Sequence, residues 1–310
     1  MKASAWIRIV CWGFVLLILT GFLICGLMDL PFFGLRFGMW DGFSWWEDDK
    51  DYLGNGSDSY QVPASGIEKL KIDWVSGRVD LQIYDGEEIC ITETSNRQLN
   101  EKNSLRYKVS GDTLKIRFRK NGILFGNLPN KDLQVMLPKR LAQSLQEVQV
   151  DAVSAKIEVN DLQAEEMHYE TTSGAIHLLG VGAKEIEVDT VSGNLDIEAA
   201  QAAEVDISTV SGATQLEGAF GTIHASGVSG QIKVQSSVCP DRVSASTVSG
   251  GVTLIIPENE GFSVSFDRVS GEFSSDFPIT LNEGEGTYKN GGADFIIDTV
   301  SGNFSVKTNP

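Results

Sequence analysis

The tripeptide Val-Ser-Gly recurs along most of the chain, and this repeat restricts the fold more than any other feature. Copies that are intact or have one residue changed place their serine at 76, 154, 173, 192, 211, 229, 249, 270 and 301. From 154 to 270 the copies follow one another every 18 to 21 residues. Self-similarity at a fixed period indicates a repeat architecture, in which each unit buries its apolar face only by stacking on its neighbours.

Apolar residues keep a fixed register around each serine. Positions six and four before it, and three and five after it, are apolar in nearly every copy, as in Leu70, Ile72, Val79 and Leu81 around Ser76. Alternation with period two on both sides predicts two short strands per repeat, with polar residues between the apolar ones facing solvent. The valine before the serine breaks this alternation, so we expect a bend at the Asp-Thr that precedes it.

These patterns predict an all-β protein, a single β-solenoid or β-roll of about nine two-stranded rungs over residues 64–310. Nineteen residues provide about 63 Å of extended chain, enough for two strands and two turns. The ends of such a roll need caps. Residues 84–147 interrupt the repeat and are expected to form a hairpin cap or insertion, in which Val109-Ser110-Gly111 is a hairpin turn rather than a rung.

The Ser-Gly pairs are interpreted as structural corners. Nine equivalent serines are better explained by a corner hydrogen bond than by nine active sites, so no catalytic residue is expected. The corner residues are Ser76, Gly77, Ser173, Gly174, Ser192, Gly193, Ser211, Gly212, Ser229, Gly230, Ser249, Gly250, Ser270, Gly271, Ser301 and Gly302.

The N-terminal part has the pattern of a membrane anchor. Residues 9–28 contain no charge and are long enough to span a bilayer as one transmembrane helix. Lys2 and Arg8 favour a cytoplasmic N-terminus, residues 1–8, and an extracytoplasmic C-terminal domain at the cell membrane. Cleavage of this segment as a signal peptide, or lipidation at Cys25, are the alternatives.

Residues 29–63 combine an aromatic juxtamembrane segment with an acidic linker. Five of the six tryptophans precede residue 47. Aromatic rings with one polar edge favour the membrane interface, so we expect residues 9–46 to contact lipid.

Charge is distributed unevenly. The net charge of −17 argues against a nucleic-acid partner. Residues 141–310 hold seven basic and 25 acidic residues, whereas residues 97–120 hold eight basic and two acidic. The roll is therefore expected to attract cations or cationic peptides, and the basic hairpin to face anionic lipid or wall polymer.

The position three before the serine carries most of the candidate metal ligands. Asp151, Glu170, Asp189, Asp267 and Asp298 occupy it, and stacked carboxylates at rung spacing favour calcium. The competing interpretation is solvated aspartates that make local hydrogen bonds at turns. Because the calcium-binding nonapeptide is missing, no cofactor is expected. The only histidines, His168, His177 and His224, fall at positions expected to face solvent.

The chain resembles the bacterial "putative adhesin" family, a domain of unknown function on envelope proteins. The Val-Ser-Gly corners, the strands LQVMLP (133–138) and TLIIP (253–257), and the closing TYKNGGADFIIDTVSGNFSVK carry the resemblance, which covers about residues 64–310. It implies a β-roll, an envelope location and a role in adhesion or the envelope-stress response, and it offers no catalytic residues.

Three functions remain open at this point. The first is a non-catalytic envelope protein that binds a ligand, such as a cationic peptide, a wall polymer or another envelope protein. The second is a polysaccharide-acting enzyme with a concave acidic pocket and a carboxylate of raised pKa. The third is a structural spacer. A disulfide between Cys90 and Cys239 is also left open.

Overall fold

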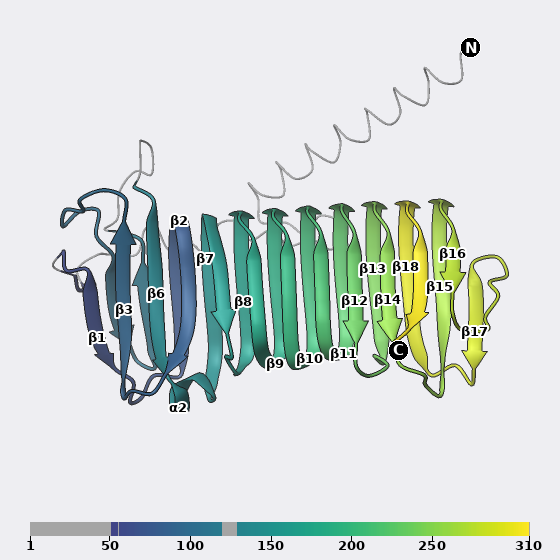
Figure 1. The fold of residues 1–310 in the computed structure, drawn as a ribbon, viewed down its shortest axis with the longest axis horizontal. Helices are drawn as coiled ribbons and strands as arrows, with labels where there is room; N and C mark the ends of the chain where they lie inside the picture. Colours follow the sequence, from purple (N-terminus) through teal and green to yellow (C-terminus); the bar gives the residue numbers. More distant parts are fainter. Residues whose placement is uncertain (1–50, 55, 120–128, 310) are drawn as a thin grey trace, which may run out of the picture. The chain divides into compact units, whose positions relative to one another are not determined.

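The computed structural model describes residues 51–54, 56–119 and 129–309, and this part of the chain is almost entirely β-strand (Figure 1). It is a β-solenoid, which confirms the all-β solenoid part of the predicted fold class. Strand segments that precede the corner serines form one sheet, here the first sheet, and segments that follow them form the second sheet. Several strands continue around the corner and belong to both.

The first sheet follows the order β4 (Arg106–Ser110), β5 (Thr113–Arg117), β2 (Lys69–Tyr84), β7 (Leu145–Asn160), β8 (Ala164–Ser173), β9 (Ile176–Ser192), β10 (Leu195–Ser211), β11 (Thr214–Ser229), β13 (Arg242–Ser249), β18 (Ala293–Ser301), β15 (Gly261–Ser270) and β17 (Glu285–Lys289).

The second sheet follows the order β1 (Ser59–Pro63), β3 (Glu88–Ser95), β6 (Lys131–Pro138), β2, β7, β9, β10, β11, β12 (Ile232–Ser236), β14 (Val252–Ile256), β19 (Phe304–Thr308) and β16 (Phe273–Ser275). The short helix α2 (Lys139–Ala142) follows β6.

Neighbouring copies of the repeat pair in register, so that one repeat makes one coil. Val188 pairs with Ile207 and Ser192 with Ser211. Each position of the repeat therefore forms a column along the solenoid. The apolar columns point inward, where the parallel coils stack Val, Ile, Leu and Phe side chains into a continuous core.

The prediction of a bend at the Asp-Thr is wrong. Thr171, Thr190 and Thr209, two residues before the serine, are 1–3 % exposed and continue the inward alternation. The valine that follows points outward, and Val300 is 44 % exposed. The strand therefore runs straight through the Asp-Thr and turns at the Ser-Gly.

Chain order and stacking order differ near the C-terminal end. β18 and β19 form the coil around Ser301, and this coil lies between β13/β14 and β15/β16 (Figure 1). β17 then pairs antiparallel with β15 and covers its outer edge.

The described elements within residues 84–147 build the other end of the solenoid. β4 and β5 form an antiparallel hairpin that turns at Gly111-Asp112 and adds no Ser-Gly corner. β5 and β6 nevertheless lie parallel to β2 and extend both sheets by one layer. The antiparallel strands β3 and β1 then close the edge of the second sheet.

The predicted transmembrane segment 9–28, residues 1–8 and the aromatic residues up to 50 lie outside the described residues. Within the described part, no helix has the length and apolar character needed to cross a bilayer. Cys90 and Cys239 are both free thiols. Cys90 lies in β3 and Cys239 follows β12, seven strand spacings away or about 34 Å, which excludes a disulfide between them.

Candidate functional site

The outer face of the first sheet gathers most of the ionisable side chains of the regular coils. Side chains six, four and two residues before the serine point inward, so those seven, five and three residues before it point outward. Stacked from coil to coil, these outward side chains form the position-seven, position-five and position-three columns. The position-three column reads, in stacking order, Asp73, Asp151, Glu170, Asp189, Ser208, Ser226, Ser246, Asp298 and Asp267.

This order divides the five candidate metal ligands into two groups. Asp151, Glu170 and Asp189 are neighbours on β7, β8 and β9. Asp298 and Asp267 are paired with each other near the opposite end, behind three serines, and both are exposed. In the described part of the chain, neither of these two belongs to a group of three metal-binding donors.

The position-five column brings histidines into the acidic face, which the sequence interpretation missed. His168 lies beside Asp151 and Glu170, and also beside Glu187 and Asp189. A third group comprises Glu204, Asp206 and His224. Within each group the donor atoms lie within 4.8 Å of one another. The signal was available in the sequence, because positions five and three share a parity and so a face.

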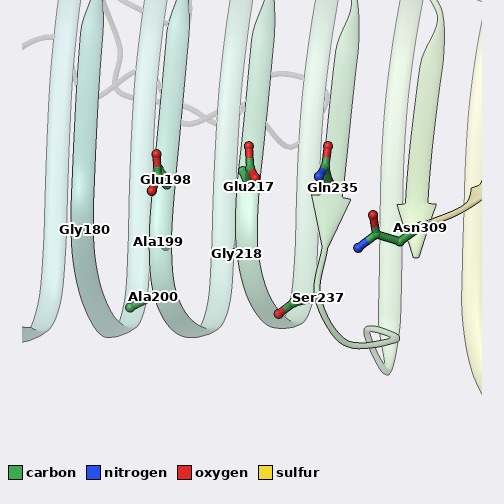
Figure 2. A pocket seen from close by; sticks show the side chains of 9 residues that line it. All are labelled: Gly180, Glu198, Ala199, Ala200, Glu217, Gly218, Gln235, Ser237 and Asn309. Carbon is green, nitrogen blue, oxygen red and sulfur yellow. The ribbon is translucent and has the colours of Figure 1, made fainter. Parts of the chain in front are cut away.

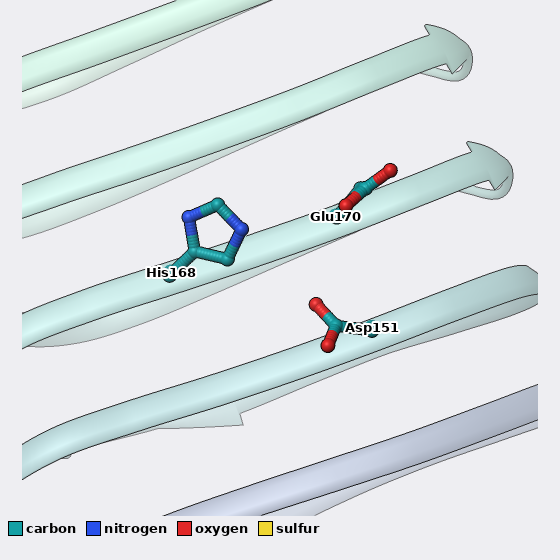
Figure 3. Close-up of side chains that lie close together, drawn as sticks. All are labelled: Asp151, His168 and Glu170. Carbon is teal, nitrogen blue, oxygen red and sulfur yellow. The ribbon is translucent and has the colours of Figure 1, made fainter. Parts of the chain in front are cut away.

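The first group lies on β7 and β8 (Figure 3), and Asp151 is its buried member. Asp151 is only 2 % exposed, and its Oδ2 accepts a hydrogen bond of 2.8 Å from Nε2 of Gln149. The other oxygen, Oδ1, is buried and has no hydrogen-bond partner. The His168 side chain is 30 % exposed, and its Nδ1 lies 3.0 Å from Oε2 of Glu187.

Burial and mutual repulsion shift the pKa values of these groups strongly upward. Burial raises the pKa of Asp151 to about 6. Burial, with the charges of Asp151 and Asp189, raises the pKa of Glu170 to about 8. Burial and the charge of Glu187 raise the pKa of Asp189 to about 6. The face is therefore a site of concentrated negative charge that protons or cations stabilise.

His168 compensates part of this charge. Burial by itself lowers its pKa, but the hydrogen bond to Glu187 and the charges of Glu187, Asp151 and Asp189 raise the pKa to about 9. Without another cation in the group, the imidazole is protonated at neutral pH.

The outer face of the second sheet carries a shallow groove of about 420 Å³. Arg78, Asp80, Glu158 and His177 are among its lining residues. Burial and the charge of Glu158 raise the pKa of Asp80. The hydrogen bond from Lys156 lowers the pKa of Glu158. This groove is thus a concave acidic pocket of the kind that the polysaccharide-acting alternative predicts.

A smaller hollow of about 280 Å³ lies further along the roll (Figure 2). Glu198, Glu217 and Gln235 occupy equivalent positions of successive coils and form one row across it. Asn309 extends the lining at the far side.

The corner serines make contacts between coils. Oγ of Ser154 donates to the carbonyl of Val75 at 3.2 Å, and Oγ of Ser270 donates to the carbonyl of Val300 at 3.4 Å. Both acceptors belong to the adjacent coil, so these hydroxyls help to fix the stacking of one coil on the next.

The basic hairpin does not present all of its charges on a surface, contrary to the prediction from the sequence. Arg106, Lys108 and Arg117 are each less than 10 % exposed. Lys108 and Arg117 lie over the ring of Tyr52 at 4.5 and 4.2 Å. These three cations are used inside the cap, so a basic surface made of the whole hairpin is not formed.

Comparison with known proteins gives one family match. The sequence profile described as Toastrack DUF4097 matches residues 61–307. No curated protein shows significant similarity to the chain.

Solved structures that match the chain include a "putative adhesin" from Bacteroides fragilis, with 13 % identity over 84 % of this chain and 98 % of that one, and a TM-score of 0.48. A "putative lipid binding protein" from Parabacteroides distasonis has 15 % identity over 83 % and 98 %, and a TM-score of 0.45. A "putative adhesin" from the same organism has 13 % identity over 81 % and 96 %, and a TM-score of 0.43. At identities this low, no ligand or role carries over.

Proposed function

The chain belongs to the Toastrack DUF4097 family, and on that premise we propose that it is a non-catalytic binding protein of the bacterial cell envelope. Residues 9–28 anchor it in the membrane and residues 64–310 hold the solenoid outside. Its role is adhesion or ligand binding by the acidic outer face of the first sheet.

The continuity of that face is the observation that carries the proposal. Three outward columns run across β7 to β10, and nine of their residues are acidic. These residues are Glu147, Glu166, Glu185, Glu187, Asp151, Glu170, Asp189, Glu204 and Asp206. Burial and the charges of neighbouring carboxylates raise the pKa of Glu185, and burial raises that of Asp206. A cationic peptide lying across the coils relieves this repulsion.

A binding experiment tests this assignment. The full-length chain in detergent is titrated with a lysine-rich peptide at increasing NaCl concentration. We expect the affinity to fall as salt rises, because the attraction is between exposed charges. Replacing the exposed Glu166, Glu185 and Glu204 with Gln should weaken binding several-fold.

The control replaces three exposed acidic residues away from this face, Glu260, Glu272 and Glu283, with Gln. It removes the same formal charge and should leave the affinity nearly unchanged. An affinity that does not depend on salt, or that falls equally in both triple variants, contradicts the assignment. A chain that binds no cationic probe leaves the structural spacer as the better explanation.

A separate experiment tests the proposed location of the solenoid outside the membrane. An epitope tag added after Pro310 should be accessible to antibody on intact cells, and the protein should fractionate with the membrane. A tag that is accessible only after lysis contradicts an extracytoplasmic solenoid.

A second candidate function is a polysaccharide-acting enzyme at the 420 Å³ groove. The pKa values of Asp80 and Glu158 are shifted in opposite directions there, which suits an acid and a base. Glycan hydrolysis by the full-length chain that is lost in Asp80→Asn, but kept in Asp132→Asn, supports this candidate. Equal activity in all three proteins contradicts it.

A further inference from the structure

An unpartnered oxygen of Asp151 points to a ligand on the outer face of the first sheet. Asp151 is 98 % buried, and Oδ1 is the half of its carboxylate that accepts no hydrogen bond. A buried carboxylate oxygen without a partner is costly, because desolvation is not repaid by any contact. The charge of His168 acts on this carboxylate but makes no hydrogen bond to Oδ1, so a directly bound cation is expected there.

Two more donor residues lie beside the carboxylate of Asp151. Glu170 is the direct neighbour of Asp151 across the sheet, and His168 precedes Glu170 by two residues on the same face of β8. One donor atom from each lies within 4.8 Å of the others. In Figure 3 the side chains of all three residues lie on one side of β7 and β8.

The imidazole of His168 is already oriented. Its Nδ1 contacts Oε2 of Glu187 at 3.0 Å. The other ring nitrogen, Nε2, lies on the side of Asp151 and Glu170 (Figure 3). A histidine that binds a metal commonly donates its second nitrogen to a carboxylate, which fixes the ring and raises its basicity. Glu187 is placed to perform this function.

We propose that Asp151, His168 and Glu170 form a binding site for one divalent transition-metal ion, with Zn²⁺ the best fit. Imidazole nitrogen and carboxylate oxygen are ordinary zinc ligands, and three of them leave a position for water. Two carboxylates balance the charge of the ion. Calcium, the ion suggested by the repeat alone, takes six to eight oxygen ligands and fits this nitrogen-containing set less well.

The two neighbouring groups fit less well. In the group of His168, Glu187 and Asp189, the Glu187 carboxylate is engaged with Nδ1, and Asp189 accepts a hydrogen bond from Ser208. In the group of Glu204, Asp206 and His224, all three side chains are partly or fully exposed. Neither contains a buried donor atom without a partner, whereas the first group does.

The test uses the full-length chain in detergent, stripped of metal with EDTA and desalted. Equilibrium dialysis against Zn²⁺ should give one tightly bound ion per chain. His168→Ala and Asp151→Asn should each weaken this binding by tenfold or more, and Glu187→Gln by about tenfold through loss of the outer partner. Thermal unfolding of each variant establishes that it is folded.

His224→Ala is the matched control, since it removes an outward histidine from the same column three coils away. This variant should still bind one Zn²⁺ ion tightly. Binding that survives in both His168→Ala and Asp151→Asn overturns the proposal. Equal loss in His224→Ala does so as well, since it indicates diffuse attraction to the acidic face. Displacement of Zn²⁺ by an equal concentration of Ca²⁺ also overturns it.

Discussion

At the scale of single residues, the glycine after a corner serine lies against the backbone of the coil beside it, and only the corner at Ser154 has alanine there instead. A β-carbon added to Gly230 would lie 1.9 Å from the carbonyl oxygen of Gly212, and the φ of Gly230 is +141°. Contact and backbone conformation both exclude other residues there. The glycine column therefore sets how closely two coils approach, and with it the register of both sheets.

Gly230→Ala should lower the free energy of unfolding by about 3 kcal/mol, because the new methyl group separates two coils and strains the backbone. Chemical denaturation measures this loss. Gly227→Ala is the control three residues earlier. Its β-carbon meets Cγ2 of Thr209 at an ordinary 3.5 Å, so the change should be within about 1 kcal/mol. Equal losses in the two variants would show that the corner is not the cause.

The cap contains a buried ion pair that, like the corner glycines, holds neighbouring segments together. Nζ of Lys131 lies 2.8 Å from Oε2 of Glu93, and both side chains are fully buried. Nζ also donates to the carbonyls of Asn103 and Phe118. Burial lowers the pKa of Lys131 to about 8. The pair joins β3 and β6 to the loops around them.

Lys131→Met should cost about 3–5 kcal/mol of unfolding free energy, because Glu93 is then left buried without its cation. Adding Glu93→Gln should recover part of this loss, since the remaining group is neutral and still accepts from the backbone N–H of Leu105. A double-mutant cycle in urea measures the coupling. A double variant that is less stable than Lys131→Met would contradict this account.

At the scale of strands, the C-terminal coil has an unusual position. β19 pairs with β14 on one side and with β16 on the other, so the last strand of the chain is internal to its sheet. Phe304 of β19 is fully buried and contacts Phe266 and Phe273 of the neighbouring coil. The end formed by β15, β16 and β17 is thus attached through β19 in the second sheet and through β18 in the first.

Ending the chain after Asn303 should remove the attachment in the second sheet and leave the pairing of β15 with β18. Loss of Phe304 and Val306 is expected to cost about 3 kcal/mol or more, because large apolar side chains leave the core. Hydrogen exchange should lose protection in β14 and β16. Ending the chain after Thr308 is the control and should leave both strands protected. Protection of β16 in the shorter chain would show that it does not rely on β19.

Sequence patterns predicted the coils but not their order. Alternation around each serine was sufficient to place both strands, because one face of each must be apolar. Any copy, however, presents similar apolar residues to its neighbours. Val264 and Phe266 of one coil are interchangeable in kind with Phe295 and Ile297 of another. The order of the last two coils therefore depends on the turns and on β17, which the repeat does not encode.

The candidate site was predicted only in part, because the sequence interpretation did not place the histidines and the carboxylates on the same face of the strand. The position-three carboxylates were recognised, but the outward valine after the threonine suggested a bend that does not exist. With the bend removed, His168 shares a face with Asp151 and Glu170. The alternation of the repeat places Asp151 on the outward face, so its exposure of only 2 % could not be predicted from the sequence.

At the scale of the whole molecule, the acidic face gives stability an unusual pH dependence. Glu170 ionises in the unfolded chain near 4.5, but its pKa in the folded protein is about 8. The folded state therefore holds a proton that the unfolded state has lost, and stability falls as pH rises through this interval. Asp151 and Asp189 act in the same direction between about 4 and 6. His168 does so between 6.5 and about 9.

With EDTA present, the free energy of unfolding should thus fall by about 3 kcal/mol or more between pH 5 and pH 8, with Glu170 as the largest contributor. Groups with lowered pKa values, such as Glu147 and Glu158, favour higher pH but act below about 4.5, outside this range. Glu170→Gln imitates the protonated side chain and should flatten the profile, mainly by stabilising the protein at pH 8. The exposed Glu272→Gln should keep the slope. Stability that rises from pH 5 to pH 8 in the metal-free protein would contradict this prediction. It would mean that burial and mutual repulsion do not raise the pKa values of these carboxylates in the folded protein.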